Sequence, residues 1–288
     1  MATVSAERNT AATAQASNSP DAVVVRFAGD SGDGMQLTGG QFTLSTALAG
    51  NDLATFPDFP AEIRAPQGTL FGVSAFQINF GSTEITTAGD APDVLIAMNP
   101  AALKTNVDAL KPGGLIIADT GEFSKRNLDK AKYDVSPLED GSLSKWDVLA
   151  FDISALTIEA VKPFGLGNKE ALRSKNMWTL GLALWMFDRD RQPIVDWLKA
   201  KFAKKPEIAD ANIAALNAGH AYGETAEISG PLKKLMSNPP RPSRDFIAPL
   251  RARRRSALAW SRVRNLPICR CSLADIRSRL PARFFTIW

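Results

Sequence analysis

Short runs of apolar residues alternate along most of the chain with longer segments of helical periodicity. The runs AVVVRF at 22–27, VLIAM at 94–98 and LIIA at 115–118 end at glycine, proline or aspartate, which predicts buried strands. Residues 72–80 and 146–153 predict two further strands. Because fully apolar strands are typical of sheets covered on both sides, we predict an α/β fold: a mainly parallel sheet with helices on both faces.

Helices are predicted where apolar residues recur every three or four positions. The first helix follows the first strand after a short glycine-rich loop, and the others lie between or after the remaining strands. These predicted helices cover residues 35–49, 101–110, 155–162, 175–187, 193–202 and 207–220. The segment 52–68 contains Pro57, Pro60 and Pro66, and we interpret it as a proline-rich connection.

A glycine-rich loop joins the first predicted strand to the first predicted helix. It consists of Gly29, Asp30, Ser31, Gly32, Asp33 and Gly34. Glycines at such a turn let backbone N–H groups approach an anion, and the helix N-terminus favours negative charge. The spacing matches neither the dinucleotide-binding fingerprint nor the Walker A loop, and carboxylates in the loop repel phosphate. Contact with a ligand and a simple tight turn therefore remain two interpretations.

Three further segments hold candidate ligand-binding residues. Glu62, Ile63 and Arg64 lie in a proline-bordered loop, where the arginine could hold a carboxylate or phosphate or form a surface ion pair. Asn99 follows a strand, at the sheet edge where α/β proteins bind ligands, or it simply ends that strand. Asn176 begins an apolar helix, so it either contacts a ligand or caps the helix.

No catalytic residue and no metal site can be assigned from the sequence. Asp119 ends the LIIA strand and has the same two interpretations as Asn99. His220 is the only histidine and has no cysteine partners nearby, so we interpret it as structural. The sequence does not identify a serine–histidine–aspartate triad that includes His220.

The net charge of +4 averages two unlike parts of the 288 residues. Residues 233–288 hold 14 Lys and Arg against two Asp, a net charge of +12, and the remainder carries −8. Cys269 and Cys271 both lie in this basic tail, so the body offers no thiolate for a disulfide or cluster, and we expect a cytoplasmic protein. Residues 1–20 are polar and are interpreted as a disordered lead without a signal peptide, and no apolar run is long enough to span a membrane.

Four segments together are more specific than any one of them. They are FAGDSGDGMQLTG at 27–39, FPDFPAEIRAPQG at 56–68, DVLIAMNP at 93–100 and KNMWTLG at 175–181. In this order and spacing they resemble the gamma domain of 2-oxoacid:ferredoxin oxidoreductases, in the form fused at the N-terminus of the alpha subunit of 2-oxoglutarate enzymes. The resemblance covers residues 21–232, which we therefore predict to be one domain.

The resemblance implies a role in oxidative decarboxylation of a 2-oxoacid to acyl-CoA and CO2, with electrons passed to ferredoxin. Thiamine diphosphate and an iron–sulfur cluster serve this reaction in the holoenzyme, and this chain alone is expected to bind neither and to be inactive. The implied partners are a beta subunit and, through the complex, ferredoxin; no membrane or nucleic acid is expected. Residues 29–34 and 62–64, with Asn99 and Asn176, are implied to face coenzyme A or the active site.

The basic tail, residues 233–288, departs from the family. An alpha subunit continues there into a thiamine-pyrimidine domain, whereas the tail is irregular and rich in arginine. Back-translated with G+C-rich codons and shifted by one frame, residues 251–288 can be read as a string containing GYPITPA, which resembles the opening of that domain. We therefore hypothesise an out-of-frame tail. The alternative is a genuine basic tail that binds nucleic acid or an anionic membrane. The second candidate function is a stand-alone module that binds a nucleotide or nucleic acid through the glycine loop and this tail.

Overall fold

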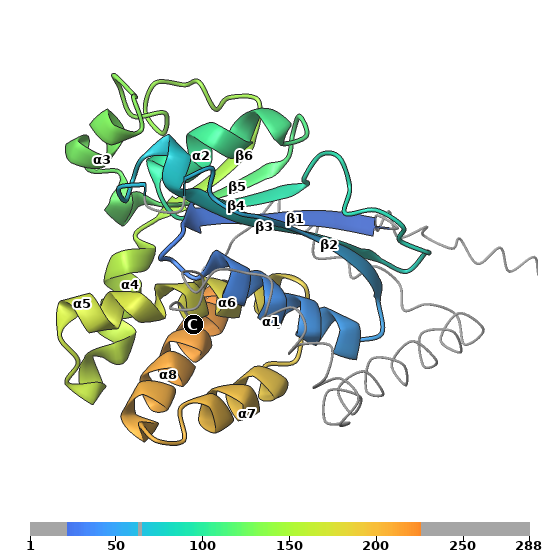
Figure 1. Ribbon diagram of the computed structural model, residues 1–288, viewed down its shortest axis with the longest axis vertical. Coiled ribbons are helices and arrows are strands. Elements are labelled where there is room, and N and C mark those ends of the chain that lie inside the picture. Colours follow the sequence, from blue (N-terminus) through green and yellow to red (C-terminus); the bar gives the residue numbers. More distant parts are fainter. Residues whose placement is uncertain (1–21, 63–64, 226–288) are drawn as a thin grey trace, which may run out of the picture. The chain divides into compact units, whose positions relative to one another are not determined.

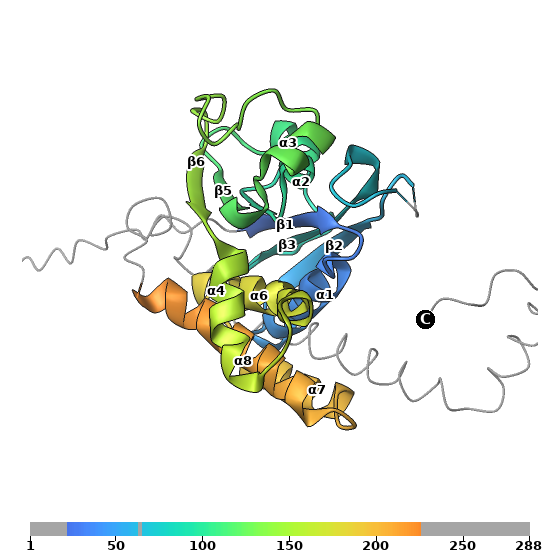
Figure 2. The ribbon, with the colours of Figure 1, turned by 90° about the vertical axis from the view of Figure 1, so that its left-hand side faces the viewer.

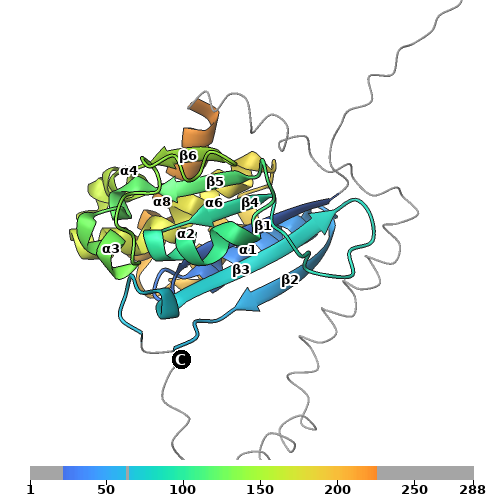
Figure 3. The same ribbon diagram turned by 90° about the horizontal axis from the view of Figure 1, so that it is seen from above.

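The computed structural model describes residues 22–62 and 65–225, and these form one mixed sheet between two layers of helices (Figure 1). The strand order in the described part is β2-β3-β1-β4-β5-β6, which Figure 3 shows from above. The strands are β1 Ala22–Asp30, β2 Asp52–Asp58, β3 Val73–Gly81, β4 Val94–Ala97, β5 Leu115–Asp119 and β6 Asp147–Phe151. Strands β1, β4, β5 and β6 pair in parallel, and β3 pairs antiparallel with β1 and β2. The predicted α/β fold is confirmed.

Helices α2 and α3 cover one face of the sheet, and α1 with α4 to α8 covers the other (Figures 1 and 2). The helices are α1 Met35–Leu48, α2 Pro100–Asn106, α3 Lys125–Lys130, α4 Ile153–Val161, α5 Asn168–Ala171, α6 Lys175–Met186, α7 Gln192–Lys201 and α8 Pro206–Thr225. The six helices expected from periodicity are all present, with boundaries that differ by a few residues. The short α3 and α5 were not predicted.

Strand β2 corrects the sequence interpretation, which placed a proline-rich connection over the whole of 52–68. Residues Asp52–Asp58 pair antiparallel with β3 instead, with Pro57 opposite Phe76. A proline lacks the N–H that a central strand must donate, but an edge strand tolerates it. Because β2 has only β3 as a neighbour in the described sheet, its proline is accommodated.

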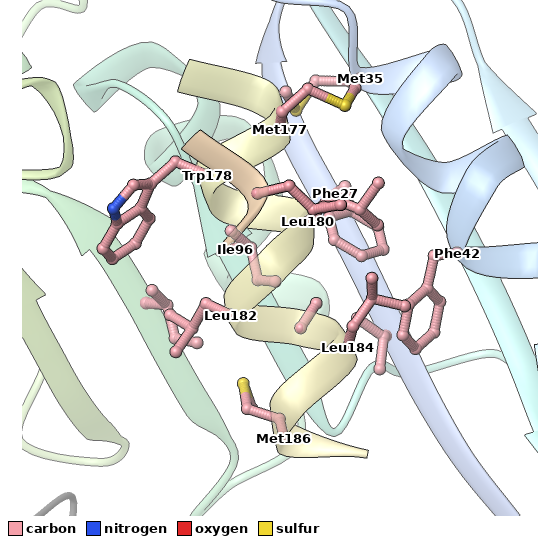
Figure 4. Packing of buried hydrophobic residues seen from close by; sticks show 14 of the residues in the cluster. Phe27, Met35, Phe42, Ile96, Met177, Trp178, Leu180, Leu182, Leu184 and Met186 are labelled. Atoms are coloured by element: carbon pink, nitrogen blue, oxygen red, sulfur yellow. The ribbon is translucent and has the colours of Figure 1, made fainter. Parts of the chain in front are cut away.

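The larger core lies between the sheet and α6, which is buried along nearly its whole length. Phe42 from α1 packs edge-to-face against Phe27, Phe80 and Phe187, with ring centroids 5.6 to 5.7 Å apart. Figure 4 shows Leu184 of α6 beside Phe42. Such edge-to-face aromatic pairs add to the free energy gained from burial alone.

The opposite face of the sheet carries small side chains where α2 packs. Ala75, Ala28, Ala97, Ala118 and Ala150 lie side by side on successive strands from β3 to β6. A row of methyl groups leaves room for a helix to approach the sheet closely. Ala102 and Leu103 of α2 belong with four of these alanines to the second, smaller cluster of buried residues.

Several predictions concern residues outside the described part. The lead at 1–20, the basic tail with its two cysteines, the domain end at 232 and both Ile63 and Arg64 fall there, and their interpretations stay predictions. Within the described ranges, no helix combines the length and the apolar character that crossing a membrane requires.

Candidate functional site

The glycine loop and the proline-bordered loop meet at the carboxyl edge of the sheet. Asp30 is the last residue of β1, and its Oδ2 accepts a hydrogen bond from the Gly68 N–H at 2.7 Å. The Ser31 N–H donates to the Gly72 carbonyl at 3.1 Å. Two segments that are far apart in the sequence are thus joined by one side chain and one backbone bond.

Two hydrogen bonds between Asp30 and Asp33 close the glycine loop, and Gly34 packs against Asn176 of α6. The Asp33 N–H donates to the Asp30 carbonyl at 2.9 Å, and the Asp30 N–H donates back to Asp33 Oδ2 at 2.9 Å. Gly34 has φ +75°, and a Cβ there would lie 2.6 Å from Asn176 Nδ2. Gly34 therefore needs glycine both for its left-handed backbone and for the close approach of Asn176.

The two asparagines of the site have different roles from each other. Asn99 caps α2, because its side chain accepts the Ala102 N–H at 2.8 Å. Asn176 does not cap α6: the helix begins at Lys175, and Ser174 occupies the cap position without a side-chain hydrogen bond. The capping interpretation of Asn176 is therefore wrong. Its side chain is buried instead, and its Oδ1 has no hydrogen-bond partner in the described part.

A buried lysine on α6 anchors the acidic side of this edge. Lys175 Nζ lies 3.1 Å from Asp119 Oδ2 and 2.9 Å from Glu122 Oε1, and its side chain is only 7% exposed. Asp119 is fully buried and also accepts the Ser154 hydroxyl at 2.8 Å. Burial disfavours the charged lysine, but Asp119, Glu122 and Asp33 together outweigh it and raise the pKa of Lys175.

Two aspartates of the glycine loop hold their protons more tightly than free aspartate does. Burial raises the pKa of Asp30, against the opposing effects of the Gly68 N–H and the Asn99 amide. Burial likewise raises the pKa of Asp33 to about 6, although Lys175 opposes the shift. A carboxyl group with a pKa near neutrality can both take up and release a proton, which suits acid–base chemistry.

The comparison with protein families decides what kind of domain this is. Residues 24–222 match the family described as pyruvate ferredoxin/flavodoxin oxidoreductase. The chain belongs to this family. The match covers nearly every described element, from β1 to the second half of α8, so the glycine loop and the carboxyl edge belong to the oxidoreductase domain.

Named relatives of this oxidoreductase domain agree with the family. The chain is 56% identical over 208 residues to the 2-oxoglutarate oxidoreductase subunit KorA of Mycobacterium tuberculosis, covering 72% of this chain and 32% of that protein. It is 26% identical over 201 residues to the ketoisovalerate oxidoreductase subunit VorA of Methanothermobacter marburgensis, covering 68% and 36% respectively. The chain thus spans about a third of the length of these relatives.

A solved oxidoreductase has a similar fold. The 2-oxoglutarate:ferredoxin oxidoreductase of Magnetococcus marinus, with 2-oxoglutarate, coenzyme A and succinyl-CoA bound, matches with a TM-score of 0.58 and 25% identity. The match covers 77% of this chain and 34% of that one. The alternative of a stand-alone nucleotide- or nucleic-acid-binding module finds no support in these relatives.

The structure brings together most of the predicted site residues of the oxidoreductase domain. The glycine loop, Asn99 and Asn176 lie at one edge, and Glu62 is exposed in the adjoining loop, while Ile63 and Arg64 are outside the described residues. Sequence reasoning missed Lys175 and Glu122. Lys175 stood next to Asn176 in KNMWTLG, but only the fold pairs it with Asp119, 56 positions earlier.

The raised pKa of Asp33 predicts a pH dependence of stability. The Asp33 carboxyl has a pKa of about 6 in the folded state and near 3.8 in the unfolded chain. Its protonated form therefore contributes fully to the unfolding free energy below pH 4, and this contribution is lost as pH rises through 6. Replacing Asp33 with Asn removes that loss. Relative to the unmodified protein, D33N should therefore gain about 2 kcal/mol of unfolding free energy between pH 4.5 and 7.5, measured by urea titration. A parallel pH profile for both proteins would contradict the expectation.

The described residues offer no metal or cluster site. Among them, no three His, Cys, Asp or Glu side chains are arranged to hold a metal ion. They also contain no cysteine, because both cysteines of the chain lie beyond residue 225. What this edge offers is a buried acidic cluster with one lysine, next to the basic helix α3.

Proposed function

We propose that this chain forms the gamma-domain part, residues 21–232, of the alpha subunit of a 2-oxoacid:ferredoxin oxidoreductase that acts on 2-oxoglutarate in the cytoplasm. It takes part in oxidative decarboxylation to an acyl-CoA and CO2, with electrons passed to ferredoxin. The 56% identity to the KorA subunit over 208 residues carries this proposal. The solved relative with coenzyme A and succinyl-CoA bound supports the same substrate class.

We place thiamine diphosphate and the iron–sulfur cluster on other domains of the complex. The described residues lack cysteine, so they do not fit a cluster held by thiolates, and no step is assigned to them through either cofactor. A beta subunit is the proposed partner, consistent with relatives that are themselves named as subunits. Activity then requires this partner and the remaining alpha-subunit domains.

The charges at the carboxyl edge suggest how coenzyme A would lie. The glycine loop carries Asp30 and Asp33, which disfavour phosphate but tolerate the uncharged pantetheine arm and its thiol. Helix α3, by contrast, presents Lys125 and Arg126 to solvent. Lys130 of the same helix donates to the Gln67 carbonyl at 2.8 Å, which places α3 beside the proline-bordered loop. We propose that the phosphates lie toward α3 and the thiol toward the glycine loop.

Asp33 is the group of this edge best suited to take up the thiol proton. In the proposed reaction the thiol sulfur would take the acyl group from its carrier elsewhere in the holoenzyme, whose bond to the acyl group breaks, and the thiol proton would pass to a base within reach. Asp33 has a pKa of about 6, so it is mostly ionised at neutral pH and can accept a proton.

The coenzyme A orientation can be tested with two exposed cations of α3. The double variant Lys125→Gln/Arg126→Gln should weaken coenzyme A binding to the full chain roughly tenfold and reduce its salt dependence, because phosphate contacts are lost. Calorimetric titration measures both. Pantetheine, which has no phosphates, should bind both proteins equally. The matched control Lys199→Gln/Lys204→Gln, on exposed positions of and after α7, should change neither affinity.

Two outcomes of that titration have different meanings. Unchanged coenzyme A affinity in the α3 variant would place the phosphates elsewhere. If the unmodified chain bound no coenzyme A, the proposed function itself would be in doubt.

The assignment as an enzyme part is tested by reconstitution. We expect the gene, read in the frame that restores the thiamine-pyrimidine domain after codon 230, to give an alpha subunit that co-purifies with a beta subunit. That complex should reduce ferredoxin only when 2-oxoglutarate and coenzyme A are both present. DNA sequencing through this region decides the out-of-frame hypothesis separately, since an unbroken frame without a missing or added base removes it.

A further inference from the structure

We propose that a pocket within the helical layer is a second binding site, for an uncharged and mainly apolar molecule that carries one hydroxyl or amide group. The pocket has a volume of about 390 Å³ and lies among α1, α5, α6, α7 and the start of α8. This volume falls in the range of small-molecule sites in proteins. The proposal does not depend on coenzyme A binding at the carboxyl edge.

Half of the residues that line the pocket are apolar. Met177 and Leu198 are 1% exposed, and the other apolar members are Leu37, Leu166, Trp197, Phe202 and Ile208. Water against this part of the wall has few polar partners, so an apolar group that displaces it gains free energy. This part of the wall therefore selects for an apolar body.

Buried polar residues define what else the ligand must carry. Ser174 lines the pocket and is only 3% exposed, and its hydroxyl neither caps α6 nor has a hydrogen-bond partner in the described part of the chain. Because this hydroxyl remains in contact with solvent, a ligand hydroxyl or amide would replace a water bound there. Two further buried polar side chains line the pocket: Asn176, whose Oδ1 has no partner in the described part, and Asn212, whose amide donates to the Ile208 carbonyl.

The rim of the pocket shows no preference for a charged ligand. It carries two acids, Glu170 and Glu207, and two bases, Arg173 and Lys205, all of them exposed. Their charges cancel, so neither an anion nor a cation is favoured at the entrance. Since the lining has no excess of either charge, we infer that the ligand is neutral.

The pocket is separate from the ion cluster, although both use the start of α6. Lys175 points its ammonium group at Asp119 and Glu122, whereas Ser174 and Met177 line the pocket. A molecule bound in the pocket would thus contact the helical turn that positions Lys175. Binding in the pocket would thereby couple to the position of Lys175 at the carboxyl edge.

The experiment compares two probes of nearly equal size, 2-naphthol and 2-methylnaphthalene, by calorimetric titration of the full chain. We expect 2-naphthol to bind saturably at one site, roughly tenfold more tightly than 2-methylnaphthalene, because only the naphthol satisfies Ser174. Ser174→Ala should remove this preference. The anion 2-naphthoate should bind more weakly than 2-naphthol.

A filling variant locates the site. Ile208→Trp, at the partly exposed edge of the pocket, should abolish naphthol binding, and Leu44→Trp, at an exposed position of α1 outside the pocket, should not change it. Both variants should keep the coenzyme A affinity of the unmodified chain. Absence of saturable naphthol binding, equal or tighter binding of 2-methylnaphthalene, or binding that survives Ile208→Trp would each overturn the proposal.

Discussion

Replacing Lys175 with Met is expected to cost about 3–5 kcal/mol of unfolding free energy, because it leaves a buried carboxylate without its counter-ion. Asp119 is fully buried and Lys175 Nζ lies 3.1 Å from its Oδ2. The methionine keeps the apolar stem of the lysine, so the change isolates the loss of charge. Urea denaturation followed by circular dichroism measures the cost.

The surface pair Lys111–Asp93 provides the matched control. Its Nζ–Oδ1 distance is 2.7 Å, but the Lys111 side chain is 46% exposed, so Lys111→Met should cost less than about 1 kcal/mol. Adding Asp119→Asn to Lys175→Met removes the unpaired charge and should restore part of the lost stability. If the two lysine variants were equally stable, the ion cluster would not hold the carboxyl edge together.

The sequence predicted those parts of the fold that local patterns determine. Every residue of β4 and β5 is buried, and so are Ile194 and Leu198 on the apolar face of α7. The pattern of apolar residues in the sequence therefore predicts these elements. Strand β2 was missed because its residues 55–57 are exposed and include a proline, and only its position at the sheet edge makes that acceptable. Edge position is a property of the whole sheet and cannot be read from one segment.

The candidate site, too, was predicted where a local pattern marks it and missed where only the fold brings residues together. The glycine loop was found because glycines and aspartates between a strand and a helix form a local pattern. The bond from Gly68 to Asp30 and the pairing of Lys175 with Asp119 join positions 38 and 56 residues apart. No spacing rule connects such positions, so their meeting followed only from the fold. The packing of Asn176 on Gly34 likewise replaced a capping role that local preference favoured.

The second large effect is expected where α6 crosses α8. A Cβ built on Gly181 of α6 would overlap the Leu216 carbonyl oxygen of α8, and one built on Gly219 of α8 would overlap the Trp178 carbonyl oxygen of α6. The obstacle is backbone in both cases, so no side-chain rotation can relieve it. Gly181→Ala and Gly219→Ala should therefore each cost about 3 kcal/mol or more, because the two helices must move apart.

Gly40 makes this expectation specific to the crossing. It lies inside α1, and a Cβ built on it has no atom within 4 Å, so Gly40→Ala should stabilise the protein by about 0.5–1 kcal/mol through reduced freedom of the unfolded chain. The same substitution thus changes the unfolding free energy in opposite directions in α1 and at the crossing of α6 with α8, within one layer. Urea midpoints of the three variants give the test: if Gly181→Ala were as stable as Gly40→Ala, α6 and α8 could not be in close backbone contact at this crossing. Lys175 and Asn176 begin the same helix, so a displaced α6 would also move the carboxyl edge and one wall of the proposed pocket.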